Sequence, residues 1–148
     1  MKAFRFSLQR VLDVKVLLEE QQQQTLAAAR ARTAAVSSQL EDARNRRAAA
    51  VREDGAHQDI DPWLRDLGWR RRTRLLRHVA QLASELEEAK RLEDEEREVL
   101  IVRHKERRVL ERLAEKQRQV YEVERGRREQ AVLDEAAARR LRGFGQVM

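Results

Sequence analysis

The chain has 148 residues, of which 39% are charged and 4% aromatic, with five glycines, one proline, no cysteine and a formal net charge of +6. So few large side chains argue against an ordinary globular core, and the lack of cysteine excludes disulfides, thiolate metal sites and cysteine nucleophiles. Ala, Arg, Glu, Gln and Leu dominate the chain, which is typical of a coiled coil, with disorder as the competing interpretation.

The first predicted element is an amphipathic helix over about residues 6–53, for which Ser7 is a candidate N-cap. Its apolar residues recur at gaps of three, four and seven, which places them on one helical stripe. They are Phe4, Leu8, Val11, Val14 and Leu18, followed by Leu26, Ala29, Val36, Leu40, Ala43 and Ala50. Because Gln21–Gln24 are polar at every position, we expect a looser contact or a shift of the heptad phase there.

A turn is predicted over about residues 54–62. Gly55 can serve as the left-handed residue after a helix end, while Asp61 followed by Pro62 is typical of an N-cap and a first helical position. Gly68 follows, either as a second interruption or as a weak point in the next helix.

The second predicted helix covers about residues 63–142, and we expect the tail 143–148 to be frayed. Its apolar stripe is also periodic, which decides against disorder. The stripe comprises Leu75, Val79, Leu82, Leu86, Ala89, Leu92, Val99, Val102, Val109, Leu113, Val120, Val123, Ala137 and Leu141. The sequence therefore predicts a single all-α domain, a long two-helix antiparallel coiled-coil hairpin with unequal helices. Roughly the segment Gln119 to Arg142 would overhang, and its apolar residues imply a partner or a fold-back by the N-terminal residues.

No enzymatic machinery is recognisable in the sequence, which lacks a Gly-rich phosphate loop, a nucleophile elbow and a metal-spaced histidine cluster. His57, His78 and His104 are isolated from one another. We expect no catalysis, metal, cofactor or small-molecule substrate. No apolar run is long enough to span a membrane and no secretory signal is recognisable, so a cytoplasmic protein is expected.

Both tryptophans fall in a short stretch before a basic run, and this stretch is a candidate binding surface. Its residues are Trp63, Leu64, Leu67, Trp69 and the run Arg70–Arg72. It is interpreted as a hydrophobic plug that closes the turn or as a docking surface for a protein. Nucleic-acid binding is disfavoured because the acids from Glu85 onward would repel phosphate.

Charge is banded along the second predicted helix, which is acidic over residues 85–98 and basic over residues 103–112. Solvated faces with intrahelical ion pairs account for such bands. Bands of opposite sign would also suit a rod inside a ring with charged inner loops. At the start of the chain, Phe4 and Phe6 are expected to pack on their own helix or on the other helix.

The two ends of the chain resemble the FliJ family, the small coiled-coil component of the bacterial flagellar type III export apparatus. The opening Phe4-Arg5-Phe6-Ser7-Leu8-Gln9-Arg10-Val11-Leu12-Asp13-Val14-Lys15 is similar to the family's F-x-F-x-L-Q-x-V-L-x-h-K start. Tyr121, with Arg128-Glu129-Gln130 and Leu133-Asp134-Glu135, resembles its E-Q-x-x-L-D-E finish.

The resemblance implies a stalk in the pore of the hexameric flagellar export ATPase that also contacts the cytoplasmic domain of the membrane export gate. Export chaperones are further implied partners, and the protein would associate peripherally with the inner face of the cell membrane. The implied ATPase-binding residues are Phe4, Phe6, Leu8, Gln9, Tyr121, Gln130 and Asp134, and the implied gate-binding residues are Trp69, Leu76 and Val79. The alternatives are the equivalent stalk of a virulence type III secretion system, a basic coiled coil that binds nucleic acid, and a coiled coil that dimerises with itself.

Overall fold

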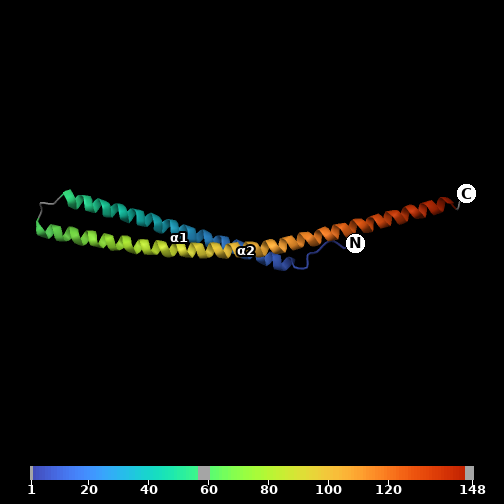
Figure 1. Cartoon of the computed structure of the whole chain (residues 1–148), viewed down its shortest axis with the longest axis horizontal. Helices are drawn as coiled ribbons and strands as arrows, with labels where there is room; N and C mark the ends of the chain where they lie inside the picture. Colours follow the sequence, from blue (N-terminus) through green and yellow to red (C-terminus); the bar gives the residue numbers. More distant parts are fainter. Residues whose placement is uncertain (1, 57–60, 146–148) are drawn as a thin grey trace. The chain divides into compact units, whose positions relative to one another are not determined.

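The computed structural model describes residues 2–56 and 61–145, and within these ranges it contains two α-helices and no strand (Figure 1). Helix α1 spans Gln9–Ala56 and has 48 residues, and helix α2 spans Pro62–Gly145 and has 84 residues. The predicted all-α class is confirmed. The helix ends lie a few residues later than expected at both ends of α1 and at the end of α2.

The start of α1 differs from the prediction. The amide of Gln9 donates to the carbonyl of Phe6 at 3.2 Å, and the carbonyl of Leu8 accepts the helical bond from Leu12 at 2.9 Å. Leu8 is therefore the N-cap residue. The prediction of Ser7 as the cap is wrong, because a turn closed by backbone groups carries the chain one residue further.

At the predicted turn, the cap of α2 is confirmed and the end of α1 is not. Asp61 accepts a hydrogen bond on Oδ1 from the amide of Trp63 at 3.2 Å, and Pro62 is the first helical residue. Gly55 lies inside α1, and no described glycine has a positive φ, so its expected left-handed conformation is wrong. His57 and the rest of segment 57–60 lie outside the described residues.

Gly68 does not interrupt α2, contrary to one of its two interpretations. A Cβ atom added at Gly68 would lie 3.0 to 3.1 Å from the carboxylate of Asp54 on α1. That carboxylate also faces Arg72, whose Nε lies 3.1 Å from Oδ2. Glycine at this position therefore allows a close approach of the two helices.

The described chain divides into two compact units. Unit 1 contains the chain up to Glu19 together with the chain from Arg103 onward, and unit 2 is Glu20–Val102. In each unit, a part of α1 packs against a part of α2.

Unit 2 is held by an apolar seam between the two helices. Its core cluster is Leu40, Ala43 and Leu82, against which Val79, Ala83 and Leu86 pack. Ion pairs cross between the helices at Arg30–Glu93, Glu53–Arg71 and Asp54–Arg72. Arg30, which comes first along α1, contacts Glu93, which comes last along α2, and Glu53 contacts Arg71.

The seam of α1 keeps one heptad phase through the glutamine run. Gln22 is half-buried, and its Nε2 donates to the carbonyl of Glu96 at 2.9 Å. From there the less exposed residues follow at gaps of four and three, namely Leu26, Ala29, Thr33, Val36, Leu40 and Ala43. The expected phase shift is therefore wrong.

The same phase, followed back along α1, reaches Glu19, Lys15 and Leu12, whereas Val11 and Val14 are exposed. Of the predicted stripe over residues 8–18, Leu18 is half-buried, whereas Leu8, Val11 and Val14 lie to one side of the seam and are exposed. Apolar residues stand on both faces there, so periodicity alone could not choose between them.

Candidate partner-binding surfaces

The N-terminal arm, residues 2–8, lies against α2 in unit 1. The ring centroids of Phe4 and Tyr121 are 5.5 Å apart with an interplanar angle of 48°, and the Tyr121 hydroxyl donates to the carbonyl of Lys2 at 2.6 Å. Phe6 is only 8% exposed. The packing of Phe4 against the other helix is confirmed, and Phe6 is buried. The arm folds back onto Tyr121, but Val120, Val123 and Leu133 of α2 stay exposed, so the arm does not cover the apolar residues that implied a fold-back.

An open hollow lies beside this arm and combines residues of the arm and α1 with residues of α2. Its lining consists of Phe4, Arg5, Phe6, Gln9, Arg10, Ala114, Glu115 and Arg118. Three of the expected ATPase-binding residues, Phe4, Phe6 and Gln9, therefore line one surface. Leu8 stands next to it and is exposed. An open surface of aromatic and charged groups suits a protein partner better than a small molecule, which prefers an enclosed pocket.

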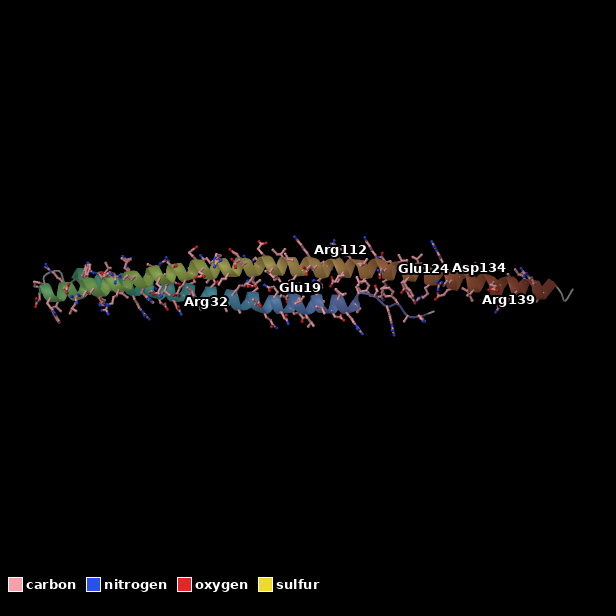
Figure 2. The ribbon with its side chains drawn as sticks, turned by 90° about the horizontal axis from the view of Figure 1, so that it is seen from below. Glu19, Arg32, Arg112, Glu124, Asp134 and Arg139 are labelled. Atoms are coloured by element: carbon pink, nitrogen blue, oxygen red, sulfur yellow. The ribbon has the colours of Figure 1, made fainter. Side chains whose placement is uncertain are left out.

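Gln130 and Asp134, the other expected ATPase-binding residues, stand apart from the arm. The Nε2 of Gln130 donates to Oδ1 of Asp134 at 2.9 Å on the surface of α2 (Figure 2 labels Asp134). Every residue from 122 to 145 is exposed. The end of α2 is therefore unpaired within the described chain, as the predicted overhang required.

The expected gate-binding residues of unit 2 differ in accessibility. Trp69 is 59% exposed and Leu76 is 48% exposed, whereas Val79 packs on the core cluster. Trp63, Leu64 and Leu67 are exposed as well. Trp69 and Leu76, seven residues apart, share one face of α2 and form an accessible apolar surface near its start. The plug interpretation concerns a turn whose residues 57–60 lie outside the described residues, so it stays a prediction.

A buried carboxylate, Glu19, is the centre of an ionic cluster in unit 1 (Figure 2). Its Oε1 lies 3.0 Å from Nδ1 of His104, and its Oε2 is hydrogen-bonded by Arg107. Arg107 also bonds Glu111. The Arg107 hydrogen bond is the main cause that lowers the pKa of the Glu19 carboxyl, with a smaller contribution from His104, while burial opposes both.

Sequence reasoning missed Glu19 and its contact with His104. The signal was present in the heptad phase. Counting back from Leu26 by four and three residues reaches Gln22 and then Glu19. A carboxylate at a seam position, with basic residues on the opposite helix, indicates an ion pair between the helices.

A second ion pair joins the two helices of unit 1. Nζ of Lys15 lies 2.8 Å from Oε2 of Glu106, and this hydrogen bond is the main cause that lowers the pKa of the Glu106 carboxyl. Arg103 approaches the same oxygen at 3.7 Å. Lys15 and Glu106 lie along one side of the seam.

The acidic band of α2 is largely paired within the helix, as expected. Arg91 contacts Glu88 at 3.4 Å and Glu95 at 2.8 Å. Arg97 similarly contacts Glu93 and Asp94. Contacts of this kind between neighbouring turns stabilise a long exposed helix by about 0.3 to 0.5 kcal/mol each.

The part of the chain that the structure describes contains neither a candidate metal site nor a candidate membrane span. No group of three or more His, Asp or Glu side chains there could hold a metal ion. Neither described helix has a stretch long and apolar enough to cross a membrane. Comparison with known proteins found no matching protein family, curated protein or solved structure.

Proposed function

We propose that the chain is a non-enzymatic stalk of the flagellar type III export apparatus, of the FliJ type. In this proposal α1 and α2 form an antiparallel hairpin with unequal helices. The hairpin binds in the pore of the hexameric export ATPase, contacts the cytoplasmic domain of the export gate and supports ATPase activity and export. The protein would then reside in the cytoplasm, held at the inner face of the membrane by these partners.

The contact between the arm and Tyr121 carries the proposal. The two segments that resemble the family are far apart in sequence, yet the rings of Phe4 and Tyr121 are in contact within one unit. Directly after Tyr121, α2 continues as an exposed helix to Gly145. An aromatic anchor followed by an unpaired helical segment supports insertion into a protein ring.

The stalk role needs binding and stiffness, and it needs no catalytic group. A continuous helix such as α2 can bias the conformations of the ATPase subunits around it through differential contacts. On the exposed segment, Arg127, Arg128 and Arg140 form no ion pair with any described residue. They are available to acidic side chains of a partner.

The gate contact would use the apolar surface near the start of α2. Trp69 and Leu76 are exposed enough to dock, and a large aromatic side chain commonly anchors an interface. Val79 would act from beneath this surface, by holding α2 against the core.

The decisive experiment is a pull-down with the flagellar export ATPase at moderate salt, followed by measurement of the ATPase rate of the complex. The full chain is expected to bind and to stimulate hydrolysis. Deletion of residues 122–148, or the double change Phe4→Ala with Tyr121→Ala, is expected to abolish binding while circular dichroism still reports helix.

The matched control is Trp69→Ala, an aromatic truncation in unit 2, which is expected to retain ATPase binding and to lose binding of the gate domain. Retained ATPase binding by the 122–148 deletion would refute the stalk proposal. Binding of a virulence-system ATPase in place of the flagellar enzyme would assign the chain to that secretion system.

A further inference from the structure

Exposed apolar side chains from both helices of unit 1 form a surface that no contact within the described chain covers. We call it the apolar face, and it consists of Val11, Val14, Val109 and Leu113, which are 44%, 52%, 65% and 37% exposed. We propose that the apolar face binds a helix of a partner protein whose apolar stripe is flanked by acidic side chains.

The Lys15–Glu106 ion pair places these residues on one side of the seam. Val11 precedes Lys15 by four residues and Val14 follows Val11 by three, while Val109 and Leu113 follow Glu106 by three and seven. Residues at these spacings lie on the same helical face. Because Lys15 and Glu106 are joined at 2.8 Å, their neighbours on α1 and α2 lie beside one another.

The other side of unit 1 has a different chemistry. His104 and Glu111 stand two and five residues from Glu106, so they lie on another face of α2. They belong to the ionic cluster around Glu19 and Arg107. One side of unit 1 is therefore closed by ion pairs, and the side with the apolar face is open to a partner.

The charged side chains at the rim of the apolar face indicate which charge the partner should carry. Lys105, Arg112 and Lys116 stand at positions −4, +3 and +7 from Val109, so they form a cationic row along its outer edge (Figure 2 shows Arg112 pointing away from α1). Arg10 stands four residues before Val14 on the opposite edge. None of these four cations has an ion pair or a hydrogen bond within the described residues. Acidic side chains on both flanks of a docked helix would complement them.

A protein helix fits this surface better than a membrane does. Two packed helices offer a groove in which the ridge of a third helix can lie. Insertion into lipid would bury the Lys15–Glu106 pair in hydrocarbon, which is costly, whereas a helix can leave it at the edge of the interface. A second copy of the chain fits less well, because its exposed segment 122–145 carries more arginines than acids.

The test uses the full-length protein and two fluorescent synthetic helices of about 21 residues, with leucine at every third and fourth position alternately. One helix has glutamate at the flanking positions and the other has lysine. Fluorescence anisotropy is expected to detect binding of the glutamate-flanked helix only, with an affinity that falls as salt is raised.

Val109→Glu is expected to weaken this binding at least about tenfold, because it places a carboxylate in the centre of the apolar face. Ile101→Glu is the matched control, since Ile101 is 43% exposed and lies five residues from Glu106, on another face of α2. The charge reversals Arg112→Glu and Lys116→Glu test the rim without touching an apolar residue, and both are expected to weaken binding.

The proposal is overturned if the glutamate-flanked helix does not bind, if the lysine-flanked helix binds equally, or if Ile101→Glu weakens binding as much as Val109→Glu. It is also overturned if Val109→Glu instead abolishes binding to vesicles of anionic lipid or dissociates a dimer in sedimentation. The arm and Tyr121 are unchanged in all of these variants, so the result is independent of the stalk proposal.

Discussion

Glu19 is a carboxylate at a position that apolar residues occupy further along α1. It is 6% exposed, and Arg107 and His104 supply its partners from α2. Water remains close because only two helices surround the site. The ion pair between Glu19 and Arg107 therefore stabilises unit 1 less than the contact between them suggests. Its role is to specify which residues of the two helices meet.

Glu19→Gln is expected to lower the free energy of unfolding by about 1 kcal/mol at neutral pH, because a hydrogen bond to a charged group is lost. The pKa of Glu19 lies below its ordinary value of 4.5 in the folded protein. Its stabilisation is therefore present above that pH and is lost as the pH falls through the folded pKa. Urea unfolding at neutral and at acidic pH measures the difference.

The gap between wild type and Glu19→Gln is expected to close at acidic pH, where Glu19 is protonated. Glu20→Gln is the control, since Glu20 is exposed and has no ion pair among the described residues. An undiminished gap at acidic pH would show that Glu19 acts through its shape and not through its charge.

The helices differ along their length in what holds them together. In unit 2 the seam is apolar and centres on Leu40, Ala43 and Leu82. In unit 1 it combines the arm aromatics with the ion pairs of Lys15 and Glu19. Apolar burial stabilises more than surface ion pairs do, and a buried ion pair such as that of Glu19 loses much of its gain to desolvation, so the seam of unit 2 is expected to dominate stability.

Leu40→Ala is expected to destabilise the protein by about 2 to 3 kcal/mol, at the lower end of the usual range because a two-helix core is open to water at its edges. Leu133→Ala is the matched control, since Leu133 is 64% exposed on the unpaired end of α2. It should change stability by less than about 0.5 kcal/mol. Equal effects of the two substitutions in urea unfolding would contradict this assignment of the core.

The elements themselves were predictable from sequence, because the helical period over residues 26–50 and 75–89 is unambiguous and the Asp61-Pro62 cap is local. The face that α1 buries over residues 8–18 was not predictable. Apolar side chains surround the helix there, and the choice depends on Arg107 and His104, which are distant in sequence. The contact of Phe4 with Tyr121 was not predictable from sequence either, because the packing of the arm against α2 determines it.

At the scale of the whole molecule, most of the candidate binding residues belong to unit 1. The last part of α2 in this unit has no partner among the described residues. Residues 122–145 form no contact that buries them. An isolated helix of this length is marginal in water, so local unfolding of this segment costs little. The segment is therefore the part of α2 whose order would change most on binding.

Limited digestion with trypsin is expected to cut first at the arginines of this segment, and later at basic residues of the paired part of α2, such as Arg103 and Arg108. The susceptible residues are Arg125, Arg127, Arg128, Arg139, Arg140 and Arg142. Mass spectrometry of early time points identifies the order. Simultaneous cleavage in the two regions would mean that pairing with α1 does not protect α2.

The placement of the aromatic residues also equips the chain with separate optical reporters. The single tyrosine, Tyr121, contacts Phe4 in unit 1, while both tryptophans, Trp63 and Trp69, are exposed in unit 2. Release of the arm would change the emission of the tyrosine, and docking of a partner near the start of α2 would change that of the tryptophans. Intrinsic fluorescence of the unlabelled protein can therefore follow the two units separately.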